Sequence, residues 1–193
     1  MPRLKVNNYV FYRELEVSKE EIRYDSWRSG SFNKENLISD IEEEFKVNGA
    51  SDRVPPFQTK NNLYERLKDK LHWSDLYKKI QHTLLRYYVR DFNLMESWAN
   101  KAVENSAFGF HSHDSDITVV YYAKNNYPEF GTNIDEQVII PGVEDSLLIF
   151  DGKIRHKLCN MPFELAVHPH NHRYSIVFDF NIDKSTNPDN IAK

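Results

Sequence analysis

Six of the eight histidines lie between positions 111 and 172, and His111 and His113 are separated by a single residue. The local sequence Phe110-His-Ser-His-Asp reads as extended chain, in which alternate side chains point to one face about 7 Å apart. Two imidazole nitrogens at that spacing can converge on one metal ion. The pair therefore predicts part of a metal site, whose other ligands must come from elsewhere in the chain.

His156 is the candidate for the next ligand. It follows an apolar run at 147–150 and a turn, so the chain can fold back there against the earlier pair. Two histidines and one carboxylate make up the facial iron site, which leaves positions open for other ligands. Asp114 and Asp116 are nearby carboxylates, although neither stands at H-x-D spacing from a histidine.

Arg173 and Ser175 share one face of an expected strand, because they stand two residues apart in an apolar run. A guanidinium group in that position can bind a carboxylate through two parallel hydrogen bonds. A hydroxyl group beside it can add one more. The two residues therefore predict a site for a carboxylate-bearing ligand.

A second group of histidines, His168, His170 and His172, also has the spacing of metal ligands. These residues lie in a polar loop between two expected strands. We therefore expect them to be solvated or to face a substrate, rather than to form a second metal site.

Capping residues and apolar side chains three or four positions apart predict four helices in the first hundred residues. Their signals are Ser18 with Glu21 for a short helix through Ile22, Asn33 for a helix that stops at Asn48-Gly49, the trio Leu63, Leu67 and Leu71 for a helix from Asn61, and Ser74 for a fourth helix. These helices are expected to pack on a core.

Beyond Phe108 the chain changes to short β-branched and aromatic runs at 117–123, 137–140, 146–150 and 174–180, with turn signals between them. Short strands at this spacing predict an antiparallel sandwich or barrel with the helices covering one face. We expect a single domain over residues 1–193. It divides into a support region at 1–97, a β core at 98–183 and a polar tail at 184–193.

The composition excludes several classes of protein. Hydrophobic residues make up 40% and aromatic residues 13% of the 193 residues, which is too apolar for a mainly disordered chain. The formal net charge of -4 gives no global basic excess for nucleic acid. No apolar run reaches the roughly 20 residues of a membrane span. The single cysteine, Cys159, excludes an internal disulfide framework and predicts a reducing, cytoplasmic location.

Taken in order, these motifs resemble those of the 2-oxoglutarate/Fe(II)-dependent oxygenases, in particular of small bacterial and phage proteins in that superfamily. The matching elements are Trp98-Ala-Asn100, His111-Ser-His113, the run from Thr118 to Tyr122, the run 147–150 followed by His156, and Arg173-Tyr-Ser175. The resemblance implies an α+β fold with a mainly β core. This core would be a double-stranded β-helix (the jelly-roll, cupin-like plan), with the N-terminal helices packed on one face.

The resemblance also implies roles for single residues. Arg173 would bind the distal carboxylate of 2-oxoglutarate, and Tyr121 would point away from the site. The implied Fe(II) ligands are His111, His113 and His156, and the implied 2-oxoglutarate ligands are Tyr122, Arg173 and Ser175.

Two departures from the family pattern matter. The usual proximal motif is H-x-D/E, and this chain has His113 at its second position. Either the metal has three histidine ligands, or the chain bulges and Asp114 or Asp116 supplies the carboxylate. The turn before the expected strand at 146–150 reads Val143-Glu-Asp-Ser, where the family usually has glycine.

The reaction implied is hydroxylation of a C–H bond in a peptidyl or small amino-acid-like substrate, with release of succinate and CO2. Nucleic acid is disfavoured, because the demethylases of the superfamily carry a second arginine six residues after the first, and this chain has Asp179 there. The alternative is a cupin-like metal-binding or interaction protein without 2-oxoglutarate turnover, which the missing carboxylate favours. The sequence leaves the oligomeric state open.

Overall fold

An antiparallel sheet of five strands is the largest element of the structure, a computed structural model that describes residues 22–26, 33–51, 57–88, 91–103 and 109–183. The strand order is β1-β6-β3-β8-β2. The strands are β1 (Ile22–Ser26), β2 (Phe92–Ala102), β3 (Ile117–Lys124), β6 (Ser146–Phe150) and β8 (Arg173–Ile182).

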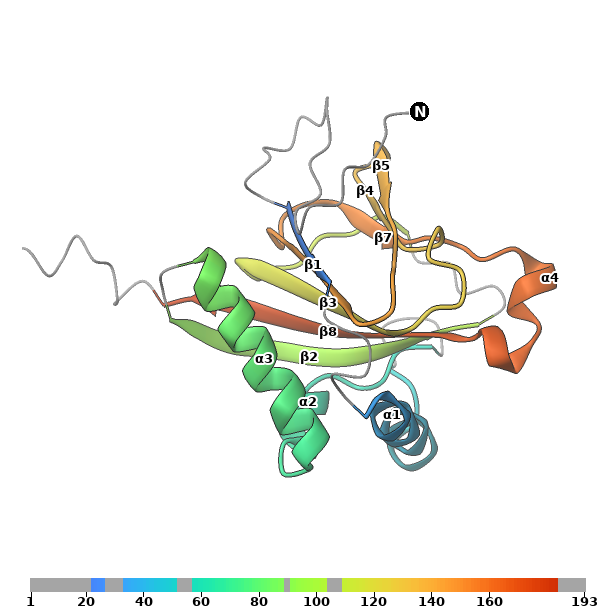
Figure 1. The fold of residues 1–193 in the computed structure, drawn as a ribbon, viewed down its shortest axis with the longest axis horizontal. Coiled ribbons are helices and arrows are strands. Elements are labelled where there is room, and N and C mark those ends of the chain that lie inside the picture. Colours follow the sequence, from blue (N-terminus) through green and yellow to red (C-terminus); the bar gives the residue numbers. More distant parts are fainter. Residues whose placement is uncertain (1–21, 27–32, 52–56, 89–90, 104–108, 184–193) are drawn as a thin grey trace, which may run out of the picture.

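A smaller antiparallel sheet faces the inner side of the large one. Its order is β5-β4-β7, with β4 at Thr132–Ile134, β5 at Val138–Ile140 and β7 at His156–Leu158. Figure 1 shows the two sheets stacked, with the small sheet on one side of β3 and β8. Two facing sheets of this kind enclose a space, which is lined by side chains from both sheets.

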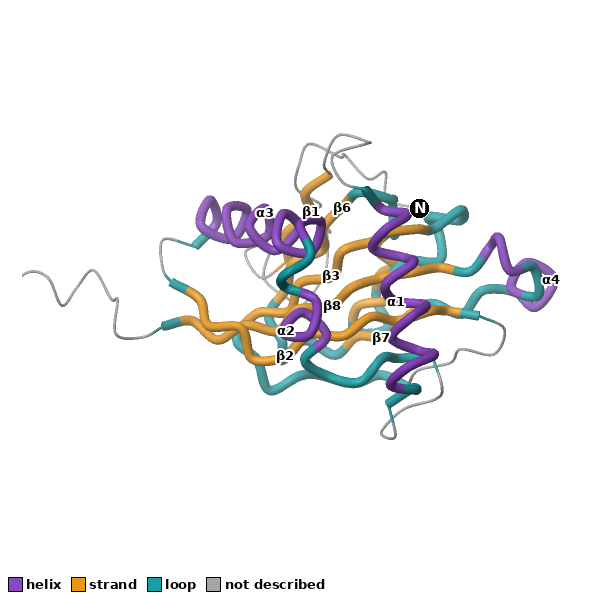
Figure 2. Tube along the Cα trace, turned by 90° about the horizontal axis from the view of Figure 1, so that it is seen from below, coloured by secondary structure: helices purple, strands orange, loops and turns teal. Residues whose placement is uncertain are grey.

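The helices cover the opposite, outer face of the large sheet (Figures 1 and 2). They are α1 (Lys34–Asn48), α2 (Leu63–Leu67) and α3 (Leu71–Tyr87). A short helix, α4 (Phe163–Ala166), and a 3-10 turn at Pro169–Asn171 precede β8. In the described part of the chain, no helix has the length and apolar character that crossing a membrane requires.

The central strands are apolar on both faces because each face packs on a different layer. In β3, Val119 and Tyr121 belong to the core between the sheet and the helices. Val120 and Tyr122 alternate with them and belong to the core between the two sheets. The expectation that Tyr121 and Tyr122 point in opposite directions is confirmed.

The helix signals are confirmed for α1 and only in part for the others. The Asn33 side chain accepts a hydrogen bond from the Asn36 amide at 3.1 Å, and Gly49 ends the helix with φ at 72°. Two expectations are wrong. Ser74 lies inside α3, and Leu71 begins α3 with its side chain 73% exposed rather than packed with the short α2.

Strand β1 replaces the end of the helix expected at 18–22. Ser18 and Glu21 lie outside the described residues, but Ile22 pairs with Phe150 on β6 and is buried. Ile22 is therefore part of a strand at the sheet edge rather than of a helix. Strand β2 was also not expected, and it crosses the boundary drawn between residues 97 and 98. Polar residues interrupt the apolar pattern of β2 because the face with Glu96 and Asn100 lines a pocket.

The turn at Val143-Glu-Asp-Ser has a direct explanation. Asp145 has φ at 59°, a left-handed conformation that glycine usually occupies and that aspartate tolerates. Its carboxylate accepts a hydrogen bond from the Tyr121 hydroxyl at 2.8 Å and pairs with the Lys34 ammonium at 3.1 Å. Two side chains from other elements therefore hold the turn that glycine would otherwise make possible.

Candidate metal centre

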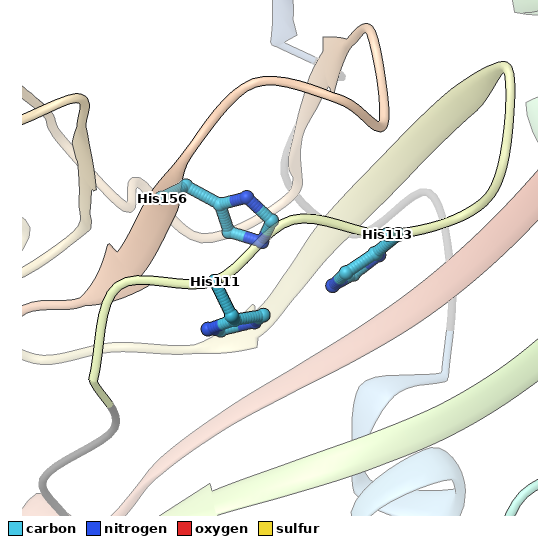
Figure 3. Close-up of side chains that lie close together, drawn as sticks. All are labelled: His111, His113 and His156. Atoms are coloured by element: carbon cyan, nitrogen blue, oxygen red, sulfur yellow. The ribbon is translucent and has the colours of Figure 1, made fainter.

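His111, His113 and His156 converge at one end of the space between the sheets (Figure 3). Each offers one ring nitrogen, and these nitrogens all lie within 4.8 Å of one another. His156 begins β7, while the other two lie on the segment that runs beside it. The main-chain amide of His113 donates to the Gly152 carbonyl at 2.7 Å, which fixes the far end of that segment.

The hydrogen bonds of the three rings define their tautomers. In each ring Nδ1 faces an oxygen atom that can only accept, so Nδ1 carries the proton and Nε2 keeps a lone pair. These acceptors are the carbonyls of Gly109 for His111 and of Ile154 for His156, and the Asp179 carboxylate for His113, each at 2.9 Å. Rings held in this way are prepared to bind a metal through Nε2.

Burial also disfavours the charged form of two of the three histidines. Burial lowers the pKa of His156 to about 3 and lowers the pKa of His111 from its ordinary value. Aromatic rings pack on the site from both sides, with Phe150 at 4.7 Å from His156 and Trp98 at 5.2 Å from His113, measured between ring centroids. A neutral imidazole is the form that binds metals, because its Nε2 lone pair is then available.

The two carboxylates considered in the sequence do not join this group. Asp114 is exposed and pairs with Lys153 at 3.3 Å. Asp116 accepts a hydrogen bond from the Ile182 amide at 2.9 Å and so ties the chain to the end of β8. Among the described residues, the group that can hold a metal consists of the three histidines.

A pocket of about 440 Å³ opens from the histidines into the space between the sheets. β2 and β8 form one wall and the small sheet forms another. Besides the histidines, its lining includes Gln58, Asn61, Glu96, Trp98, Asn100, Phe110, Val120, Thr132, Leu158, Ser175 and Val177.

Arg173 is a buried cation on the same face of β8 as Ser175 and Val177, which line the pocket. Its side chain is 1% exposed, and its Nη2 donates to the Cys159 carbonyl at 2.9 Å. Nε and Nη1 have no hydrogen-bond partner within the described residues. Burial lowers the pKa of Arg173 to about 10, so the group is still charged at neutral pH. Two unsatisfied donors on a buried cation indicate room for an anionic ligand.

The other expected cosubstrate ligands lie close by. Ser175 is buried on the same face of β8 and lines the pocket. Tyr122 is fully buried, and its hydroxyl forms a 2.7 Å hydrogen bond with the Thr132 hydroxyl, which lines the pocket in its place. Thr132 was therefore missed in the sequence, where a lone threonine outside any motif gave no signal.

The second histidine group stays apart from the metal centre. His168 and His170 are exposed and stack on each other with ring centroids 5.4 Å apart. His172 follows the 3-10 turn, and burial lowers its pKa. None of the three belongs to the group that can hold a metal.

Asp179 is a second residue near the site that the sequence did not predict. It was considered only as the absence of an arginine, yet its carboxylate contacts His113. The Thr118 hydroxyl donates to the same carboxylate oxygen at 2.7 Å. Its even spacing from Arg173 could have indicated this position, because residues an even number of positions apart lie on one face of a strand.

Comparison with known proteins gives a fold and no closer relative. No protein-family model matches the chain, and no curated protein matches it. Among solved structures, the chain is similar to the non-heme alpha ketoglutarate dependent carbocyclase SnoK from nogalamycin biosynthesis, with TM-score 0.63, 9% identity and coverage of 86% of this chain and 81% of that chain.

Two further structures support the same fold. For AviO1 from Streptomyces viridochromogenes Tue57 the TM-score is 0.62 at 12% identity, covering 87% of this chain and 92% of that one. For the viral collagen prolyl hydroxylase of Paramecium Bursaria Chlorella virus-1 it is 0.58 at 9% identity, covering 92% and 100%. At such low identity the likeness shows that the chain shares the fold of these structures, and it leaves the activity to be argued from the site.

Proposed function

We propose that this protein is an Fe(II)- and 2-oxoglutarate-dependent oxygenase that hydroxylates a C–H bond of a peptidyl or small amino-acid-like substrate. The observation that carries the proposal is that three histidines meet at one pocket, while a buried Arg173 with two unpartnered nitrogens lies on the face of β8 that lines this pocket through Ser175 and Val177. We also propose that the two facing sheets make up a double-stranded β-helix, as in the structures that the chain resembles.

The donor set fits Fe(II). Three imidazoles that bind through Nε2 can occupy one face of the metal, and imidazole suits Fe(II) among the divalent metals. The convergence of His111, His113 and His156 from one side leaves the pocket side for other ligands. Their hydrogen-bonded Nδ1 atoms hold the rings in place before any metal binds.

Arg173 and the residues near it on the inner face of β8 fit 2-oxoglutarate. Arg173 would bind its distal carboxylate through the two nitrogens that have no other partner, Nε and Nη1. The hydroxyl groups of Ser175 and Thr132 would add hydrogen bonds, with Tyr122 holding Thr132 in position. A charge-assisted pair in a buried place is strong, because no water competes for either group.

When bound, Fe(II) and 2-oxoglutarate would supply the reaction with dioxygen, in which one oxygen atom enters succinate as CO2 is released and the other enters a C–H bond of the substrate. The protein supplies the positions of the ligands. The rings of Trp98 and Phe150 pack against His113 and His156 and hold these two imidazoles in place.

The substrate class is supported by the outer wall of the pocket. Gln58, Asn61, Glu96 and Asn100 line it, and the buried Oδ1 of Asn100 has no partner within the described residues. The Asn61 amide donates to the Glu96 carboxylate at 2.8 Å and orients it. Carboxylate and amide oxygens accept hydrogen bonds, so this wall suits the N–H groups of an amino acid or a peptide.

Anaerobic titration tests the reaction class. We expect Fe(II) followed by 2-oxoglutarate to give a metal-to-ligand charge-transfer absorption band, and addition of oxygen to release succinate. Failure to form the band, with no succinate released with any amino-acid or peptide substrate, would reject the oxygenase. The same result with retained metal binding would favour a cupin-like metal-binding protein, which the all-histidine ligand group makes the second candidate.

The cytoplasmic location expected from the single cysteine remains part of the proposal. Cys159 is free and buried, and its carbonyl oxygen accepts from Arg173.

A further inference from the structure

We propose that Asp179 is a second-sphere carboxylate of the metal centre, which positions His113 and supplies the negative charge that a carboxylate ligand supplies in H-x-D sites. The inference rests on the proposed metal site and adds a residue to it. The missing ligand charge arises because His113 stands where the family pattern has aspartate or glutamate.

The geometry places Asp179 directly behind a ligand. It lies on the inner face of β8 and is 6% exposed. Its Oδ1 accepts hydrogen bonds from Nδ1 of His113 at 2.9 Å and from the Thr118 hydroxyl at 2.7 Å. Because Nδ1 donates to this carboxylate, Nε2 of the same ring faces the two other histidines. A carboxylate in this position fixes the tautomer and makes the imidazole a stronger ligand.

Hydrogen bonds around Thr118 fix the carboxylate in turn. The Thr118 hydroxyl lies 3.1 Å from Nδ1 of His113 and 3.2 Å from the Ser115 hydroxyl. Ser115 is buried and belongs to the same segment as His113. Hydrogen bonds thus join the His113 imidazole and the Asp179 carboxylate to the hydroxyl groups of Thr118 and Ser115. These residues come from β3, β8 and the segment that holds His111 and His113.

The charge of Asp179 is otherwise poorly compensated. Within the described part of the chain, its one ion-pair partner is His113, and no lysine or arginine lies within 4.0 Å of its carboxylate. A buried carboxylate without a cationic partner is costly. A divalent cation bound on the other side of the His113 ring would compensate this charge, and three neutral imidazoles give a metal no charge of their own.

Arg173 and Asp179 carry opposite charges on the same strand, β8. Both residues are buried on the inner face of β8, and each lacks an ordinary side-chain counter-ion within the described residues. They stand six positions apart in the strand, about 20 Å, so they do not neutralise each other. The inner face of β8 therefore carries a buried cation at its start and a buried anion next to His113.

Substitution Asp179→Asn tests the charge. The variant keeps the shape of the side chain and an oxygen that can accept from His113, so it removes the charge and little else. The matched control is Asp116→Asn, which has the same change in net charge and keeps its acceptor for the Ile182 amide. Circular dichroism and urea unfolding establish that both variants are folded.

Two measurements without turnover report the result. We expect Asp179→Asn to weaken Fe(II) binding about 10- to 100-fold in an anaerobic titration, the usual loss for an outer-shell partner. We also expect the reduction potential of the bound iron to become more positive, because a nearby negative charge stabilises Fe(III). Asp116→Asn should leave both quantities at the wild-type values.

The outcomes separate this inference from the proposed function. If the wild-type chain binds Fe(II) and Asp179→Asn has the same affinity and potential, Asp179 is a structural residue and the inference is wrong. A shift of affinity with no shift of potential would also reject the charge role. If the wild-type chain binds no Fe(II), the proposed function fails first and the inference fails with it.

Discussion

His111 and His156 exchange two main-chain hydrogen bonds, although 44 residues separate them in the chain. The His111 amide donates to the His156 carbonyl at 3.0 Å, and the His156 amide donates back to the His111 carbonyl at 2.8 Å. Residues paired directly opposite in antiparallel chains have their side chains on the same face. Backbone pairing therefore sets the distance between two of the three histidines, whatever their side chains bind.

Substitution His156→Ala should abolish metal binding and leave the fold intact. The main-chain bonds to His111 do not depend on the imidazole, so the segment should keep its position. We expect Fe(II) or Co(II) affinity to fall at least 100-fold in a calorimetric titration, because one of three ligands is lost. His170→Ala is the matched control, since His170 is exposed and outside the group. Retained affinity in His156→Ala would disprove this ligand.

Substitution Arg173→Met should separate the cosubstrate from the metal. We expect unchanged Fe(II) affinity and a loss of about 100-fold or more in 2-oxoglutarate affinity, since breaking a buried ion pair costs about 3 to 5 kcal/mol. The ligand-free protein should lose little stability, because Arg173 has no anionic partner within the described residues. Titration of the metal-loaded variant checks the affinity. Unchanged 2-oxoglutarate binding would remove Arg173 from the site.

The metal-free protein should lose stability as the pH falls from about 6.5 toward 3. The unfolded chain protonates His156 near pH 6.5, whereas burial lowers the pKa of His156 to about 3 in the folded state. The unfolded state therefore binds more protons in that window, and the free energy of unfolding falls by up to about 1.4 kcal/mol per pH unit. His111, whose pKa is also lowered, acts in the same direction.

Urea unfolding with a chelator present measures this dependence, and His156→Gln is the comparison. The variant should show a shallower fall between pH 6.5 and 4 than the wild-type chain, while the two should differ by a constant amount above pH 7. Equal slopes in both proteins would show that His156 is not the group responsible.

Gly152→Ala should disturb the metal site through the backbone. A Cβ atom at position 152 would lie 2.3 Å from the Ser115 hydroxyl and 2.4 Å from the Ser115 carbonyl, so the chain must shift there. The Gly152 carbonyl holds the His113 amide, and we therefore expect a metal affinity at least 10-fold weaker. Gly109→Ala is the matched control, because a Cβ atom there meets nothing within 4 Å. Equal affinities in the two variants would contradict this account.

Features that depend on neighbouring residues were predicted from the sequence, and features that depend on contacts between distant segments were not. Alternation and capping are local, and they predicted β3, β6 and α1 well, as well as the opposite directions of Tyr121 and Tyr122. The H-x-H spacing, the later His156 and the arginine–serine pair were visible for the same reason. Each is a short pattern whose chemistry depends on residue type and on two neighbours.

Interactions between distant segments decided the rest. β1 forms at Ile22 because β6 offers an edge to pair with, and Leu71 is exposed because the short α2 ends at Leu67. Asp116 stays apart from the three histidines because its carboxylate accepts a hydrogen bond from the Ile182 amide on β8. Asp179 reaches His113 only because β8 pairs with β3 in one register. The sequence by itself determined which groups could bind a metal, and the pairing of strands far apart in the chain decided which of them meet.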